Sequence, residues 1–284
     1  MLAFHSCWTK PFKVRNPNKQ FNIPPFELLT TILSALTWRK HNGSICMICD
    51  KTAYDFYKNN NLTALWDSGI KILLDDIPSK INPHIFWACG KLFALKSQTA
   101  PCVMLDTDFI VWEKLSFDNI KIGAIHSEPI NPQIYPSSEN LSACKNFNFS
   151  DLDWNVPPAN TALSFFGDND FTKLYTETAI NFMLSCENAD NPLTYMVFAE
   201  QRLLSMLAKR QNIDIKYFSN LDELFISGQK KFTHTWGFKQ QMLANNNIMN
   251  EFCTRCAKRI MLDFKDWTSI ISSIPSLSRY FNIN

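Results

Sequence analysis

Short apolar runs alternate with longer segments of helical periodicity, and this alternation constrains the fold more than any other feature. Apolar runs typical of buried strands occur at 44–50, 70–77 and 101–115, while 26–43 and 84–98 have apolar residues at helical spacing. Strands buried on both faces read as continuous apolar runs, and the helices between them cover a parallel sheet. The pattern predicts an α/β fold with a mostly parallel sheet flanked by helices.

The rest of the chain continues this pattern around a long polar loop. Further strands are expected at 121–128, 160–167 and 213–219, and further helices at 53–62, 168–186 and 194–211. Residues 129–158 are rich in Pro, Asn and Ser, which is typical of a functional or mobile loop. No shift in composition marks a linker. We therefore expect one domain over 1–284, with its core in about 1–240 and a helical extension over about 241–284.

Composition excludes some classes of protein. The chain has 28 basic and 26 acidic residues and a formal net charge of +2, which gives no electrostatic reason to expect nucleic acid binding. It has only 7 glycines and neither a dinucleotide-binding glycine fingerprint nor a P-loop. Residues 1–15 lack the pattern of a secretory signal, and no apolar run is long enough to span a bilayer. We therefore expect a cytoplasmic protein without a transmembrane segment.

The nine cysteines are scattered and lie mostly in apolar segments. This use of cysteine indicates small core residues in a reducing compartment rather than a disulfide framework. Two CxxC pairs occur, at 46–49 and 253–256. A zinc or redox site is the less favoured interpretation, because residues three apart in a strand point to opposite faces.

Asp106 and Asp108 stand between two apolar runs, Cys102–Leu105 and Phe109–Trp112. Residues two apart in an extended chain point to the same face, so both carboxylates would lie side by side at the end of a strand. That end of a parallel strand opens onto the ligand crevice of an α/β sheet. Like charges this close repel each other, and Mg²⁺ or Mn²⁺ bound by the oxygens would remove the repulsion. The alternative is a strand end with two solvated or helix-capping acids.

The same motif resembles the nucleophile loop of haloacid-dehalogenase-type phosphatases, in which Asp106 would form a covalent aspartyl-phosphate. In that family the motif usually closes the first strand, near the N-terminus. Here it follows several alternating elements, and Ile110 occupies the position where Thr or Val is usual. A phosphatase therefore stays as an alternative.

Five motifs in order resemble those of one enzyme family. They are 44-SICMICD-50, 90-GKLFAL-95 with 103-VMLDTDFIVWEKL-115, 160-NTALSFFG-167, 199-AEQRLL-204 and 234-HTWGFK-239. Through them the chain resembles, over about 2–239, the GT-A-fold, DxD-containing glycosyltransferases. The likeness is greatest to bacterial relatives of the retaining galactosyl- and glucosyltransferases and to an uncharacterised bacterial domain family of the same plan.

The resemblance implies a GT-A, Rossmann-like fold and a metal-dependent transferase. The sugar would come from a nucleotide-sugar, with a UDP-sugar as the expected donor, and would go to a glycan or another hydroxyl acceptor. The expected setting is the synthesis of bacterial surface polysaccharide or glycoconjugates. A non-catalytic, sugar-nucleotide-binding protein of the same fold is the alternative within this resemblance.

The resemblance also implies a metal site of Asp106, Asp108 and His234. An imidazole beside two carboxylates favours Mn²⁺ over Mg²⁺. Asp106 and Lys239 would bind the nucleotide, and the charge of Lys239 would stabilise the departing nucleoside diphosphate. Taken alone, such a histidine is more often structural and such a lysine is solvated.

Further nucleotide-binding residues are implied near the ends of the first two strands. Phe4, His5 and Ser6 would lie where the base is expected, and Asp50 would bond the ribose or the base edge. Lys91 would contact a phosphate or the donor sugar. The alternatives are a strand-end cap for Asp50 and a helix-surface charge for Lys91.

The catalytic residues implied by the resemblance are Glu200, Gln201 and Asn160. Gln201 or Asn160 would border the anomeric carbon in a retaining enzyme, and Glu200 would deprotonate the acceptor hydroxyl in an inverting one. Arg202 occupies a position where Asp is common, and the late motif is shorter than usual before Lys239. These departures leave the stereochemistry and the role of Lys239 open. The alternative for 200–202 is the polar face of an amphipathic helix.

The acceptor side is expected under the loop 129–158. Tyr135 and Trp154 would stack on sugars there, or would pack the loop against the protein. The basic segment 255–259, together with Phe264 and Trp267, gives a peripheral membrane contact or a solvated helix face as alternatives.

Overall fold

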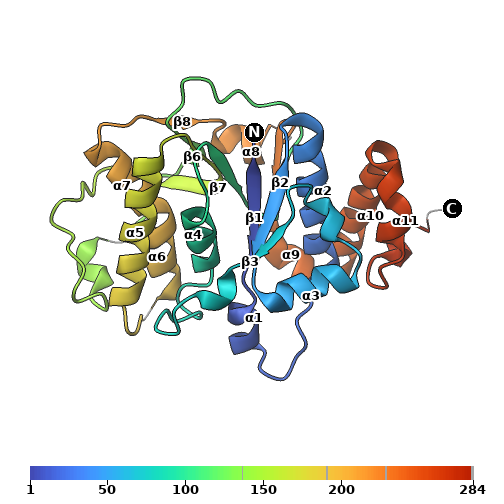
Figure 1. The fold of residues 1–284 in the computed structure, drawn as a ribbon, viewed down its shortest axis with the longest axis horizontal. Coiled ribbons are helices and arrows are strands. Elements are labelled where there is room, and N and C mark those ends of the chain that lie inside the picture. The colour runs from blue at the N-terminus through green and yellow to red at the C-terminus, as the bar shows by residue number, and fades with distance from the viewer. Residues whose placement is uncertain (136, 190, 228, 283–284) are drawn as a thin grey trace.

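Among the residues that the structure describes, seven strands form a central sheet (Figure 1). The computed structural model describes residues 1–135, 137–189, 191–227 and 229–282. The strands are β1 (Ala3–Cys7), β2 (Ile45–Cys49), β3 (Ile70–Ile72), β4 (Cys102–Leu105), β6 (Ile122–Ser127), β7 (Ala159–Phe166) and β8 (Ile215–Tyr217). Their order is β3-β2-β1-β4-β7-β6-β8, and β7 runs antiparallel to β4 and β6 while the other neighbouring pairs are parallel. The predicted fold class, a mixed and mostly parallel α/β sheet, is confirmed.

Helices cover both faces of this sheet (Figure 1). One face carries α2 (Pro25–His41), α3 (Lys51–Asn59) and α10 (Asn246–Asp263), and the other carries α4 (Cys89–Lys96), α5 (Asn169–Ser185), α6 (Pro192–Val197) and α7 (Leu203–Arg210). The shorter helices are α1 (Lys10–Arg15), α8 (Leu221–Phe225), α9 (Phe238–Ala244) and α11 (Thr268–Ser272). The predicted helical C-terminal region is present as α10 and α11.

The inner strands divide their side chains between two apolar cores, one on each face of the sheet. In β2, Ile45, Met47 and Cys49 pack on the α2 side, whereas Cys46 and Ile48 pack on the α4 side. All five residues are buried, which explains why the strand reads as a continuous apolar run. Cys46 and Cys49 therefore belong to opposite cores, as their strand position predicts.

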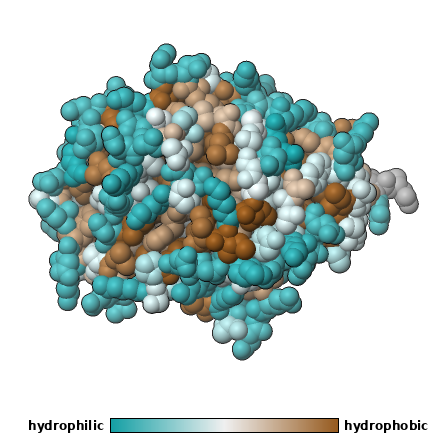
Figure 2. Space-filling view, in the orientation of Figure 1, coloured by the Kyte–Doolittle hydropathy of each residue, from teal (hydrophilic) through white to brown (hydrophobic). Residues whose placement is uncertain are grey.

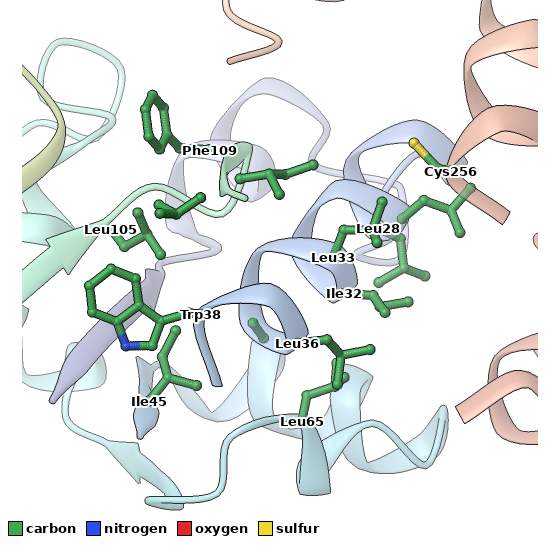
Figure 3. Close-up of a cluster of buried hydrophobic side chains, with 14 of the residues drawn as sticks. Leu28, Ile32, Leu33, Leu36, Trp38, Ile45, Leu65, Leu105, Phe109 and Cys256 are labelled. Carbon is green, nitrogen blue, oxygen red and sulfur yellow. The ribbon is translucent and has the colours of Figure 1, made fainter. Parts of the chain in front are cut away.

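Helix α2 lies between the sheet and the C-terminal helices. Every residue from Phe26 to Trp38 except Glu27 is buried. Figure 3 shows Leu28 near Cys256 of α10, whereas Trp38 lies toward the sheet. Apolar side chains on both sides of α2 therefore attach α10 to the rest of the fold, and truncating one such Leu to Ala is expected to cost about 2–5 kcal/mol.

The structure corrects several expected boundaries. Strand β3 ends at Ile72 because a short 3-10 helix follows at Leu74–Asp76, and α4 begins only at Cys89. The segment 101–115 is two strands, β4 and β5 (Phe109–Val111), rather than one. Strand β5 pairs with β9 (Phe232–His234) in a separate two-stranded sheet, and β9 is not among the predicted strands.

The long loop 129–158 folds back onto the α4 side of the sheet. Its side chains Leu141, Cys144 and Leu152 are buried in the core on that side. A disulfide joins Cys144 to Cys186 at the end of α5, which corrects the expectation that the cysteines are unpaired core residues. The spacing of 42 residues carries no signature that would indicate this pair. Six of the seven free cysteines are buried, as predicted.

The surface mixes polar and apolar regions. On the face drawn in Figure 2, hydrophobic residues gather across the middle of the molecule and hydrophilic residues surround them. Within the described part of the chain, no helix combines the length and the hydrophobicity that crossing a bilayer requires.

Candidate functional site

The strand order indicates that a ligand would bind beside β1. From β1 the chain runs outward to β2 and β3, and it then returns to β4 on the other side of β1. In open α/β sheets, ligands bind outside the carboxyl ends of the strands where the order reverses in this way. Asp106 directly follows β4 and therefore stands at this point of the sheet.

A turn, rather than an extended strand, brings the two aspartates together. The N–H of Phe109 donates to the carbonyl of Asp106 over 3.0 Å, which closes a four-residue turn. The N–H of Asp106 donates to the carbonyl of Ala162 in β7 over 2.8 Å, which fixes the start of the turn. The expectation that Asp106 and Asp108 share one face of a strand is therefore wrong, because the strand ends at Leu105. The expectation that their carboxylates lie close together holds.

The third member of the cluster comes from the unpredicted strand β9. His234 lies opposite Phe109 in the β5–β9 pair, and the hydroxyl of Thr235 donates to Asp108 Oδ2 over 3.2 Å. As a result, Asp106, Asp108 and His234 offer ligand atoms that all lie within 4.8 Å of one another. The structure thus brings together the three residues that the resemblance implied as metal ligands.

Within the described residues, the histidine has no competing structural role in hydrogen bonding. Its buried Nδ1 has no hydrogen-bond partner among them, and its Nε2 lies 3.7 Å from Asp108 Oδ2, too far for a hydrogen bond. Burial lowers the pKa of His234 to about 4, although Asp108 acts in the opposite direction. The imidazole is therefore neutral at neutral pH, which is the form that binds metals. Two carboxylates and a neutral imidazole fit a divalent cation.

Each aspartate also faces its own lysine. Lys91 Nζ lies 2.7 Å from Asp106 Oδ1, and Lys239 Nζ lies 2.9 Å from Asp108 Oδ2. Burial raises the pKa of Asp106, which Lys91 only partly offsets. Burial would also raise the pKa of Asp108, but the charge of Lys239 reverses the direction and lowers it. The two lysines explain how two carboxylates are held between two apolar strands.

Glu200 joins this network from a π-helical segment, η4 (Phe198–Arg202), between α6 and α7. Its Oε1 accepts from Lys91 Nζ and, over 2.5 Å, from the hydroxyl of Thr161. Lys91 thus lies between Asp106 and Glu200, and only 12% of its side chain is exposed. Glu200 Oε2 has no hydrogen-bond partner among the described residues. Single π-helical turns occur frequently at functional sites, and this one turns Glu200 toward β7.

The amides of the implied catalytic residues are already bonded within the protein. Gln201 Oε1 accepts from the hydroxyl of Tyr135. Asn160 Nδ2 donates to Glu128 Oε1 over 2.9 Å, and its Oδ1 accepts from the N–H of Ala162 over 3.1 Å. Gln201 is therefore joined to the loop 129–158 through Tyr135, and Asn160 is joined to the residue that directly follows β6.

The implied nucleotide-binding residues differ in their access to solvent. Phe4 and His5 have no exposed surface, whereas Ser6 is half-buried. His5 lies in a buried chain of hydrogen bonds: its Nδ1 accepts from Trp66 Nε1 over 3.2 Å, and its Nε2 lies 3.0 Å from Ser34 Oγ. In this conformation a nucleotide could reach only Ser6 of the three.

Asp50 and Lys91 both have structural partners. Asp50 Oδ1 accepts from the N–H of Ala53 and caps α3, while Oδ2 accepts from the N–H and the hydroxyl of Thr9. This is the cap that was the alternative for Asp50. Lys91 is buried in the carboxylate network described above, so it is not a solvated surface charge.

Tyr135 and Trp154 of the loop pack against the protein. Trp154 stacks on Phe198 with ring centroids 5.6 Å apart and planes at 15°, and Tyr135 is buried. Arg202 lies over the Trp154 ring at 5.4 Å and donates to the Trp154 carbonyl over 2.6 Å. Packing is therefore the role that the structure shows for these side chains.

Several residues of the site have no sequence signal of their own. Thr161, Thr235 and Glu128 each bond a residue that the motifs single out, and all three are common residue types without a diagnostic spacing. For the two threonines, the only available signal is their position directly after Asn160 and His234 in two of the motifs. Glu128 lies in none of the motifs.

Comparison with known proteins finds one family and several solved structures. The model of a family of unknown function, DUF6734, matches residues 1–273. No curated protein matches the chain significantly.

Among solved structures, three similar chains are glycosyltransferases by name. Mouse xyloside xylosyltransferase 1 has 10% identity over 76% of this chain and 84% of that chain, with a TM-score of 0.38. The mannosyltransferase Ktr4p of S. cerevisiae has 11% identity over 75% and 68%, with a TM-score of 0.40. The PaToxG glycosyltransferase has 12% identity over 99% and 83%, also with a TM-score of 0.40.

Proposed function

The chain belongs to DUF6734, a family of unknown function, and we propose that it is a metal-dependent glycosyltransferase. The donor is a nucleotide-sugar, with a UDP-sugar as the expected one, and the acceptor is a hydroxyl group of a glycan or another molecule. We assign residues 1–284 to one transferase domain with its core in about 1–240. The proposed setting is cytoplasmic synthesis of bacterial surface polysaccharide or glycoconjugates.

One observation carries this proposal. Asp106, Asp108 and His234 gather within 4.8 Å of one another at the point of the sheet where the strand order reverses. Two lysines flank the cluster. Carboxylates, an imidazole and ammonium groups at such a crevice suit a cation that is shared with the phosphates of a nucleotide.

The fit of the three residues to a cation follows from the donor set, two carboxylates and an imidazole whose Nε2 lies 3.7 Å from Asp108 Oδ2. Asp106, Asp108 and His234 would hold the metal, and Mn²⁺ suits this mixture of oxygen and nitrogen ligands. When bound, the metal would neutralise charge on the diphosphate that leaves the sugar.

The chain's own residues supply the remaining chemistry. Lys239 has a third of its side chain exposed, so its ammonium can reach a diphosphate and stabilise the negative charge that develops there. Lys91 holds Asp106 and Glu200 in place through both ion pairs. Glu200 Oε2 is the oxygen that we assign to the acceptor hydroxyl, because Oε1 is already bonded to Lys91 and Thr161.

The test is thermal unfolding with Mn²⁺ against a panel of nucleoside diphosphates. A ligand that binds only the folded state at 100 times its Kd adds about 2.7 kcal/mol to the stability. We expect a Mn²⁺-dependent rise in Tm with UDP that is lost in Asp108→Asn. The matched control is Asp118→Asn, which changes an exposed aspartate that bonds Ser116.

The alternatives give different results in the same series. No rise in Tm with any nucleotide would contradict the proposal, and a covalent phosphate on Asp106 would then identify a phosphatase. A nucleotide-dependent rise without turnover of any nucleotide-sugar would indicate the non-catalytic, sugar-nucleotide-binding alternative.

A further inference from the structure

Two adjoining cavities form a groove that begins at His234 and runs along α10. They have volumes of about 430 and 470 Å³. The residues that line both are Gln229, Thr233, Phe252 and Arg255. We call this the α10 groove. Phe225 and Trp236 line its end near His234, and Trp112, Lys230 and Arg259 line its far end.

The end near the candidate metal site is aromatic. Trp236 is 54% exposed, which is unusual for so large an apolar side chain. Its ring lies 6.4 Å from that of His234 at an angle of 24°, and 5.9 Å from that of Phe225, which is 41% exposed. An exposed indole next to a transfer site offers a flat apolar surface to the face of a sugar ring.

The far end is basic. Lys230, Arg255 and Arg259 line it, and none of the described residues that line either cavity is acidic. Arg259 pairs with Asp263 and lies over Trp112 at 5.0 Å. Arg255 is exposed and forms no ion pair with any carboxylate that the structure describes, since its recorded contact is with the Phe252 ring. A guanidinium without a counter-charge favours a carboxylate or phosphate oxygen.

We propose that the α10 groove binds the acceptor, and that this acceptor is an anionic glycan. One of its sugar rings stacks on Trp236 beside the metal cluster, and its carboxylate or phosphate group pairs with Arg255. The role as acceptor rests on the proposed function, whereas the binding of an acidic sugar chain does not.

The test is direct binding by calorimetry at low salt, without Mn²⁺ or nucleotide. The probes are trigalacturonate for the carboxylate form, α-maltose 1-phosphate for the phosphate form, and neutral maltotriose. We expect an anionic probe to bind and maltotriose to bind at least tenfold more weakly. Arg255→Gln and Trp236→Ala should each weaken the anionic probe about tenfold, because each loses one well-defined contact. The matched control Lys258→Gln removes an exposed charge of α10 outside the groove and should bind as the wild type does.

Four outcomes count against the proposal. It is overturned if neither anionic probe binds, or if Arg255→Gln and Lys258→Gln weaken binding equally. It is also overturned if UDP displaces the anionic probe, because the groove would then be the nucleotide site. If the protein binds phosphatidylglycerol vesicles through Arg255 but binds none of the sugars, the α10 groove would be a membrane contact rather than an acceptor site. If UDP fails to raise the Tm, the proposed transferase function is contradicted, but the calorimetric experiment still tests whether the α10 groove binds an anionic glycan.

Discussion

Lys239 Nζ lies 2.9 Å from the same Asp108 oxygen that accepts a hydrogen bond from Thr235. The ammonium therefore neutralises a carboxylate that the proposed function assigns to a divalent cation. Lysine and metal compete for one charge, so binding of the metal would release Lys239 toward the diphosphate. Lys239 would thereby neutralise Asp108 in the metal-free protein and contact the diphosphate in the protein with bound metal and nucleotide.

The first prediction concerns this competition. Lys239→Met should lower the stability of the metal-free protein by about 1–2 kcal/mol, because the buried Asp108 loses the counter-charge of a lysine that is itself a third exposed. Mn²⁺ should then raise the Tm more than it does in the wild type. The control is Lys231→Met, which breaks an exposed pair with Glu113 and should change the stability by less than about 0.5 kcal/mol. An unchanged response to Mn²⁺ would argue against a shared site.

A second prediction concerns the buried network around Lys91. Lys91→Met leaves the buried Glu200 and the partly buried Asp106 without a cation and should cost about 3–5 kcal/mol in urea unfolding at neutral pH. Adding Glu200→Gln to that variant should recover part of the loss, because only Asp106 then remains unpaired. Strictly additive effects of the two substitutions would show that Lys91 and Glu200 do not act as one network.

A third prediction follows from the burial of His5. Burial lowers the pKa of His5 to about 3, although Asp108 acts in the opposite direction. Because the unfolded chain binds a proton near pH 6.5 and the folded protein does not, the free energy of unfolding falls as the pH drops from about 6.5 toward 3. The slope is about 1.4 kcal/mol per pH unit, so the loss from pH 7 to pH 5 is about 2 kcal/mol. Above pH 6.5 this contribution does not vary.

The test compares urea unfolding of the wild type and His5→Gln at both pH values. The variant has no imidazole at this position, so its stability should fall by about 2 kcal/mol less than that of the wild type. Equal losses in the two proteins would mean that His5 is protonated in the folded state as readily as in the unfolded one.

A fourth prediction concerns the disulfide between Cys144 and Cys186. Replacing both cysteines by alanine should cost about 2–4 kcal/mol under oxidising conditions, because the bond closes a long loop in the unfolded chain. A reducing agent should lower the wild type nearly to the stability of the variant and leave the variant unchanged. Insensitivity of the wild type to reduction would show that the bond does not form in solution.

Periodicity predicts most of the central sheet well, because inner strands such as β4 and β7 are buried on both faces and the helices are long enough to show a repeat. β2 and α5 are good examples: every residue of β2 is buried, and α5 carries a capping Asp168 at its start. The three-residue strand β9 shows neither pattern, since it is too short for a period to be seen. Its pairing with β5 is a contact between distant segments, and only the resemblance to a family indicated His234.

The partners of the site residues are equally invisible in a single sequence. Asp106 and Asp108 are prominent because acids are rare between apolar runs. Nothing in the spacing indicates that Lys91, far earlier in the chain than Glu200, lies between Asp106 and Glu200. Asp50 shows the reverse case, in which a residue prominent at a strand end is held by a helix cap and by Thr9.

The small β5–β9 sheet has a consequence for the molecule as a whole. Asp108 and Thr235 are 127 positions apart in the chain, and β9 is followed directly by α9 and α10. A cation held by Asp108 and His234 would act as a removable crosslink between the turn that follows β4 of the central sheet and the C-terminal helices. The cation would then also hold the C-terminal helices against the rest of the fold. Removal of the cation would first appear as faster amide hydrogen exchange in α9.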